Sequence, residues 1–255
     1  MTPPPIQHIP IEAVAFLILF ARVGAVLMVL PVFSEDAIPG RIRLMIAFGM
    51  TVGLWGLLSP YALPVARDIN AATTVILAEL LTGLALGMLV RIMFLAIATA
   101  GSIISLQVGL TSAIIMDPAQ GGQSTVLGKA LSVAAAVVCL GLLVHHLWIG
   151  ALIRSYAVFP VGGLPPAGDF AELAIGTVGR SLALAVSLAA PMLVYGIVFN
   201  VALGLAARLT PSIQVFFVAQ PLNLLLGIAL FAALFGTILS QFADASIGWI
   251  QLGWR

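Results

Sequence analysis

Ionised side chains are scarce in this chain. Only 7% of its 255 residues are charged, whereas 62% are hydrophobic. Soluble globular domains carry about a quarter charged residues, because their surface must face water. A folded chain of this length with so few charges cannot cover itself in polar side chains. Its outer surface must therefore meet lipid or other apolar subunits.

A strong net charge and multiple cysteines are also missing. The formal net charge is +1, so no basic or acidic balance points to nucleic acid or to an anionic substrate. The single cysteine, Cys139, excludes both a disulfide within one chain and a zinc site built on several thiolates. It lies in an apolar run, where a small buried hydrophobe is the expected role.

The motifs of the common enzyme classes are absent as well. Residues 122–130 superficially resemble a phosphate-binding loop, but five residues separate the two glycines where that motif has four, and Ala130 replaces its Ser or Thr. His145 and His146 are neighbours, about 100° apart around a helix, so they cannot both face one metal ion. We therefore expect no enzyme activity, no metal site and no cofactor.

Long apolar runs dominate what is present. A helix needs about 20 mainly apolar residues to span the hydrocarbon core of a bilayer. The runs are continuous rather than alternating, which predicts helices and not strands. Prolines at 60, 64, 191, 211 and 221 are expected to end or kink these helices. The sequence predicts an all-α, polytopic integral membrane protein of helical hairpins. Its expected helices are 11–30, 44–58, 71–90, 92–106, 129–153, 181–207 and 209–243.

Three charged residues interrupt the apolar runs. Arg22 and Glu79 lie inside predicted helices, and Arg91 separates two of them. Each charge costs roughly 2.5–3.5 kcal/mol in a membrane helix, so each needs a physical reason. One interpretation makes these residues part of a gate or ion pathway. The other, which we favour for Arg22 and Glu79, pairs them with each other or with neighbouring subunits.

The segment 107–123 is the most polar part of the interior of the chain. It combines glycine and proline with several glutamines and one aspartate, and these residues oppose a regular helix. Non-helical backbone at membrane depth is tolerated only against protein or a water-filled cavity. The segment is therefore either a constriction within a passage or an ordinary loop between spans. Composition alone favours the ordinary loop.

Seven short blocks, in order along the chain, resemble one protein family. They lie at 20–33, 38–44, 79–87, 100–101, 107–118, 146–148 and 203–216. Together they are similar to FliR, a subunit of the type III export gate of flagella, and to its injectisome counterparts. No single block is specific, but their order across nearly the whole of one apolar chain is.

The resemblance implies a function and a set of partners. A FliR-like chain stands beside FliP-like and FliQ-like subunits, with FlhB- and FlhA-like export components, and passes unfolded substrates through the bacterial inner membrane at the flagellar basal body. Residues 1–165 would correspond to FliP-like helices and residues 166–255 to a FliQ-like hairpin. The plug loop of the family would fall on residues 107–122 and would close the passage. Its candidate residues are Gln107, Gly109, Met116, Asp117, Pro118, Gln120, Gly121 and Gly122.

Two alternative functions remain open. The chain could serve an injectisome rather than a flagellum. It could also be a secondary transporter of a small solute, with Glu79 or Asp117 as a proton site.

Overall fold

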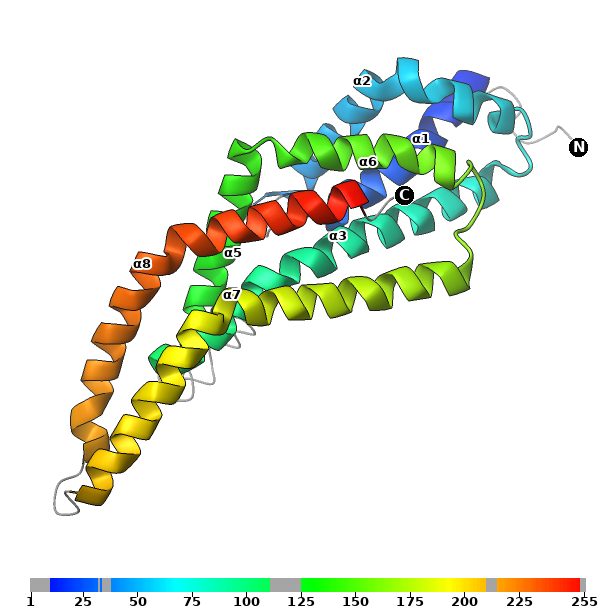
Figure 1. The fold of residues 1–255 in the computed structure, drawn as a ribbon. Coiled ribbons are helices and arrows are strands. Elements are labelled where there is room, and N and C mark those ends of the chain that lie inside the picture. The colour runs from blue at the N-terminus through cyan, green and yellow to red at the C-terminus, as the bar shows by residue number, and fades with distance from the viewer. Residues whose placement is uncertain (1–9, 32, 34–37, 111–124, 210–214, 253–255) are drawn as a thin grey trace, which may run out of the picture. The chain divides into compact units, whose positions relative to one another are not determined.

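The computed structural model describes residues 10–31, 33, 38–110, 125–209 and 215–252. All regular secondary structure within these residues is helical, as the sequence predicts (Figure 1). The helices are α1 (Ile11–Val29), α2 (Gly40–Ala66), α3 (Ala72–Val108), α5 (Val126–Gly141), α6 (Val144–Val158), α7 (Ala167–Leu209) and α8 (Val215–Leu252).

The helices form two compact units, each built from separate stretches of the chain. Unit 1 comprises residues 1–93, 143–178 and 253–255, and unit 2 comprises residues 94–142 and 179–252. Helices α3 and α7 each contribute to both units. The predicted division at residues 165 and 166 rests on likeness to two other proteins and stays a prediction.

The core of unit 1 forms where α1 meets α2. Ile18 and Leu19 of α1 are fully buried, and so are Leu58 and Ala62 of α2. Tyr156 of α6 completes this core from a distant part of the chain. Positions 58, 62 and 66 recur every helical turn, so they form one apolar stripe along α2.

The core of unit 2 uses the second half of α3 together with α5, α7 and α8. Ile97, Ala100 and Ile104 form a fully buried stripe on α3. At the crossing of α3 and α5, a Cβ on Gly101 would lie 2.5 Å from the Cα of Gly128, so only glycine permits this close approach. The part of α7 in unit 2, residues 179–209, and α8 run antiparallel as a long hairpin (Figure 1).

Prolines do not end the described helices, although the sequence predicted a turn at Pro60 and Pro64. Pro60 and Pro64 lie inside α2, Pro191 lies inside α7 and Pro221 inside α8. Each proline removes one backbone hydrogen bond, but the apolar stripe of α2 packs against α1 on both sides of its prolines. Tertiary packing therefore outweighs the local preference. Pro211 lies outside the described residues.

Two further helix predictions need correction. Residues 71–90 and 92–106, expected as two helices, form the single helix α3, because Arg91 is exposed and does not interrupt it. The expected helix 129–153 is instead two helices, α5 and α6, with a break at Leu142 and Leu143. Leu143 adopts a left-handed backbone conformation with φ of 59°, which a regular helix cannot contain.

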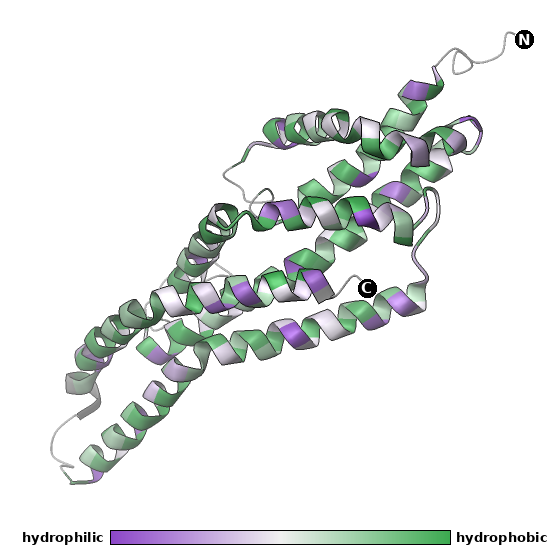
Figure 2. Ribbon diagram, turned by 45° about the horizontal axis from the view of Figure 1, so that its top comes forward, coloured by the Kyte–Doolittle hydropathy of each residue, from purple (hydrophilic) through white to green (hydrophobic). Residues whose placement is uncertain are grey.

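Long apolar helices remain the main feature of the described chain. Five of them are long and apolar enough to cross a membrane, and six if α5 and α6 together make one broken span. Figure 2 shows hydrophobic residues along nearly the whole of each long helix, with hydrophilic residues scattered among them. Only 17% of the most apolar window of α2, and of α8, is buried within the chain. Lipid or other apolar subunits must cover the rest, as expected for an all-α multi-pass membrane protein.

Two pairs of glycines on neighbouring helices have opposite surroundings. A Cβ on Gly83 of α3 would lie 2.6 Å from the backbone oxygen of Arg22 on α1, and one on Gly87 would lie 3.0 Å from Val29 Cβ. Gly49 and Gly53 of α2 have no atom within 4 Å of the corresponding position. The first pair is used inside unit 1, whereas the second faces away from the described chain.

We expect Gly83→Ala to lower the free energy of unfolding of the detergent-solubilised chain by roughly 1–3 kcal/mol, because the α1 backbone must move. Gly53→Ala is the matched control and should raise that free energy by roughly 0.5–1 kcal/mol through its higher helix propensity. Denaturant titration followed by circular dichroism measures both. Equal effects of the two substitutions would show that α1 and α3 do not approach at Gly83.

Candidate functional site

The candidate site lies in unit 2, at the end of α3, where the predicted plug segment begins. Gly109 has φ of 87° and so occupies the left-handed position that follows a helix. Its N–H donates to Leu106 O at 3.2 Å, and the N–H of Leu110 donates to Ser105 O at 3.0 Å. These two bonds make a Schellman motif, which uses two of the last four carbonyls of the helix.

The remaining two carbonyls at the end of α3 are satisfied from another helix. The side-chain amide of Asn223 on α8 donates from Nδ2 to Gln107 O at 3.2 Å and to Val108 O at 3.3 Å. The Tyr195 hydroxyl on α7 donates to Asn223 Oδ1 at 2.8 Å, and it also lies 3.0 Å from Asn223 O. Tyr195 thereby points the amide nitrogen of Asn223 at α3, and no carbonyl of the final turn is left without a donor.

Close packing at two glycines holds the end of α3 against both helices of the hairpin. The side chain of Gln107 fills the space that a Cβ on Gly196 of α7 would need. A Cβ on Gly227 of α8 would lie 2.9 Å from a methyl group of Val108. Larger residues at either glycine would push α3 away, so the hydrogen bonds and the steric fit act on the same three helices.

Thr125, the first described residue after the predicted plug segment, lies beside α3. Thr125 caps α5, because its Oγ1 accepts from the N–H of Gly128 at 3.1 Å. The Thr125 hydroxyl also lies 3.5 Å from the Ser102 hydroxyl of α3. Ser102 precedes Val108 by six residues, or about 9 Å along a helix. The chain therefore leaves α3 and comes back to it within a short distance.

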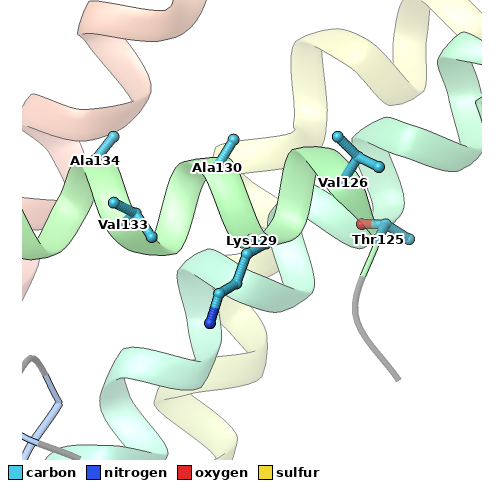
Figure 3. Close-up of a pocket in the computed structure, with 6 residues that line it drawn as sticks. All are labelled: Thr125, Val126, Lys129, Ala130, Val133 and Ala134. Atoms are coloured by element: carbon cyan, nitrogen blue, oxygen red, sulfur yellow. The ribbon is translucent and has the colours of Figure 1, made fainter. Parts of the chain in front are cut away.

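An open groove runs along α5 from this return point. Its volume is about 760 Å³, and Figure 3 labels its six lining residues. Val126, Ala130 and Ala134 line up on one edge of α5, whereas Lys129 extends in another direction (Figure 3). The groove is thus mainly apolar, and it begins at Thr125, three residues after the predicted plug segment.

The structure describes only part of the predicted plug. Gln107 and Gly109 lie at the end of α3, as described above. The other predicted members of the set lie outside the described residues; they are Met116, Asp117, Pro118, Gln120, Gly121 and Gly122. Sequence reasoning missed Tyr195 and Asn223. Asn223 is an amide in a long uncharged run, and that contrast is the signal that could have identified it.

A second polar site lies in unit 1, around Arg22 and Glu79. Both side chains are fully buried. The guanidinium donates two hydrogen bonds to the carboxylate, Nε to Oε2 at 2.7 Å and Nη2 to Oε1 at 2.8 Å. Arg22 also donates to Phe159 O at 3.0 Å and to the Ser155 hydroxyl at 3.4 Å. Its guanidinium carbon lies 4.1 Å from the centre of the Tyr156 ring.

Both carboxylate oxygens of Glu79 accept hydrogen bonds. Its Oε1 accepts a further bond from the N–H of Gly162 at 3.0 Å. The pair therefore joins α1, α3, α6 and the turn after α6 in one network. Each charge has a partner at close range, as burial in an apolar setting requires. The sequence allowed either a gate or ion pathway or a pairing of these charges. The geometry shows that Arg22 and Glu79 pair with each other.

The other singled-out polar residues make no comparable cluster. Arg91 is exposed. The rings of His145 and His146 lie 4.3 Å apart, but no group of three His, Cys, Asp or Glu side chains suited to a metal ion occurs in the described part of the chain. Cys139 is buried and forms no disulfide.

Comparison with known protein families decides the identity of the fold. Residues 13–247 match the family described as "Bacterial export proteins, family 1". This chain belongs to that family. Both polar sites lie within the matched residues, so they are part of the export-protein fold and not additions at its ends.

Individual members of the export-protein family support the assignment. The flagellar biosynthetic protein FliR of Caulobacter vibrioides is 39% identical, over 84% of this chain and 86% of the relative. FliR of Escherichia coli is 34% identical, over 84% and 81%. The Yop proteins translocation protein T of Yersinia pestis is 26% identical, over 82% and 80%. The predicted resemblance to the FliR family is confirmed.

We expect Arg22→Ala to lower the free energy of unfolding of this export protein by about 3–5 kcal/mol, because it leaves the Glu79 charge buried without a partner. The double variant Arg22→Ala/Glu79→Ala should lose less than the sum of the two single variants. Denaturant titration in detergent micelles measures the cycle.

Arg91→Ala is the control, because it also removes a cation from one of the long helices. It should change the free energy of unfolding by no more than about 0.5 kcal/mol, because Arg91 is exposed. Strict additivity of Arg22→Ala and Glu79→Ala would contradict the energetic importance of the pair.

Proposed function

We propose that this chain is a core subunit of a flagellar type III protein export gate in the bacterial inner membrane, at the basal body. With FliP-like and FliQ-like subunits it encloses a passage for unfolded flagellar substrates, and FlhB- and FlhA-like components stand beside it. Its membership of the bacterial export protein family carries this proposal. The names of its relatives, a flagellar biosynthetic protein and a translocation protein, support it.

The exposed surface of the chain suits a subunit with apolar neighbours. On α7, Ile197 and Val198 are more than 60% exposed, and on α8 Leu225 is 69% exposed. A helix whose apolar residues point outward on several sides cannot bury them within its own chain. Lipid covers such surfaces on one side of a subunit, and neighbouring subunits cover them on the other.

The end of α3 supports a closing role for residues 107–122. The helix end, the Asn223 amide and the two glycine contacts hold one end of the segment, and Thr125 beside Ser102 holds the chain three residues beyond the other end. A segment with two fixed ends can block a passage without being lost from it. We propose that it closes the gate until a substrate or a partner shifts the balance toward an open state.

The structure argues against the small-solute transporter with Glu79 as its proton site. Both oxygens of Glu79 accept hydrogen bonds from Arg22, and Oε1 also accepts one from Gly162. A proton carrier must exchange protons with a water-filled path, whereas Glu79 is fully buried in a network of its own unit. Asp117, the other candidate, lies outside the described residues.

The flagellar branch is favoured over the injectisome branch by similarity. The two FliR proteins named above are 39% and 34% identical to this chain, whereas the Yersinia translocation protein is 26% identical. All three align over at least 80% of their own lengths, so the comparison covers most of each protein. We therefore propose flagellar substrates.

Purification from native membranes tests the partners. A tagged copy of the chain should bring down FliP-like and FliQ-like subunits in a complex that survives mild detergent, because its outward apolar surface is then covered by protein. Deleting the gene for the FliQ-like subunit is the control and should leave an incomplete complex. A chain that purifies alone and moves a small solute in liposomes would refute the export-gate assignment.

Conductance measurements test the closing segment. Replacing residues 111–122 with a four-residue Gly-Ser linker should make the assembled complex leak small ions in planar bilayers, because the passage loses its obstruction. The replacement keeps Gly109 and Leu110, which end α3, and so leaves the fold of the helices in place. A Gly-Ser replacement of full length is the control that separates chain volume from side-chain chemistry. Unchanged conductance of the shortened complex would end the closing role.

A further inference from the structure

The last turn of α3 depends on one side chain from a distant part of the chain. The Schellman motif at Gly109 satisfies the carbonyls of Ser105 and Leu106 within the helix end itself. The carbonyls of Gln107 and Val108 are left to Asn223, more than 100 residues later in the sequence. Asn223 is only 9% exposed, so its bonds to α3 are shielded from solvent.

Tyr195 makes this arrangement specific. An asparagine amide can turn over and present either its oxygen or its nitrogen. The bond from the Tyr195 hydroxyl to Asn223 Oδ1 favours the orientation in which Nδ2 faces α3. Three helices thus take part: the α7 hydroxyl orients the α8 amide, and the α8 amide donates to two carbonyls of α3.

We infer that Asn223, oriented by Tyr195, is a positioning residue that latches the end of α3 to the hairpin and sets how readily the following segment is displaced. We call Tyr195, Asn223 and the carbonyls of Gln107 and Val108 the α3 latch. The inference rests on the proposed closing role of residues 107–122. It adds the contact whose release accompanies opening.

The chemistry of the α3 latch suits reversible release. Its bonds to α3 are neutral amide-to-carbonyl bonds, each of which contributes about 1 kcal/mol net, or about a fivefold change in an equilibrium constant. Water or the N–H groups of an extended polypeptide can donate to the same two carbonyls. Release in a filled passage therefore leaves no carbonyl unsatisfied, whereas release in an empty, dry one does. The latch therefore stabilises the closed state, and it is released when water or a polypeptide supplies competing donors.

The steric fit at Gly196 and Gly227 explains why release need not unfold the helix. Gln107 and Val108 fill the space over these glycines, and that contact does not depend on the Asn223 amide. The turn at Gly109 then becomes free to move while the body of α3 stays packed in unit 2.

Three variants in the assembled complex test the α3 latch. Asn223→Leu keeps a similar volume and removes both donors. Tyr195→Phe keeps the donors and removes only the orienting hydroxyl. Asn200→Ala is the matched control, because the Asn200 amide on α7 bonds within its own helix, to Gly196 O at 2.8 Å, and does not take part in the latch.

Two measurements are made on each variant: hydrogen exchange at the amides of Gly109 and Leu110, and ion leak in planar bilayers. For Asn223→Leu we expect exchange and leak to rise about 25-fold over Asn200→Ala, because each of the two lost hydrogen bonds contributes about a fivefold change. Tyr195→Phe should give a smaller rise in both. Helix exchange elsewhere and the yield of complex should match the control.

The outcomes separate the latch from the closing role. Unchanged exchange at Gly109 and Leu110 in Asn223→Leu overturns the latch. Faster exchange without leak also overturns it, provided that the shortened 111–122 complex leaks. If neither complex leaks, the closing role itself fails. Should Asn223→Leu not assemble, Tyr195→Phe decides the matter by the same two measurements.

Discussion

The backbone carbonyls at the end of a buried helix need donors, and the most informative part of this structure follows from that need. Helix α3 ends in unit 2 against α7 and α8, where Val108 is fully buried. A glycine in the left-handed conformation turns the chain back and satisfies two carbonyls, and the Asn223 amide satisfies the next two. Without both devices α3 would continue past Val108 or leave carbonyls unpaired at a cost of several kcal/mol. The direction in which the chain leaves α3 at Gly109 and Leu110 is a consequence of this helix end.

The same requirement shapes unit 1, where it concerns charges instead of backbone groups. Arg22 and Glu79 stabilise each other only because three further groups, from Ser155, Phe159 and Gly162, complete their hydrogen bonds. A buried charge pair contributes little to stability compared with a well-packed apolar pair. It does link α1, α3 and α6 in the observed arrangement, in which both charges have partners. Each unit thus has one polar network that specifies how its helices meet.

Much of the fold could be predicted from hydropathy. The start of α1 at Ile11 was predicted, and its observed last residue, Val29, lies one before the predicted end. Where a prediction failed, either tertiary packing outweighed a local signal or the sequence carried no signal. Pro60 reads as a helix end, yet the stripe of Leu58, Ala62 and Ala66 against α1 carries α2 past it. The break between α5 and α6 had no marker in the sequence, because leucine rarely adopts a left-handed conformation.

The candidate site was only partly accessible to sequence reasoning. Gln107 and Gly109 were named from their composition and from family resemblance, whereas Tyr195 and Asn223 were not. Hydrogen-bond partners more than 100 residues apart leave no periodicity to detect. The close approach of Gln107 to Gly196 was equally invisible, since Gly-containing helices also include open faces such as that of Gly53.

The sequence by itself determined that an apolar environment surrounds this protein. So few charges in so long an apolar chain require helices in lipid or among sister subunits, because backbone groups have no other partners there. It also determined which residues needed compensation, namely the charges of Arg22 and Glu79. Only the tertiary structure decided which groups meet those needs. The partners of a buried polar group are chosen by how the helices pack in three dimensions, and spacing along the chain does not encode that choice.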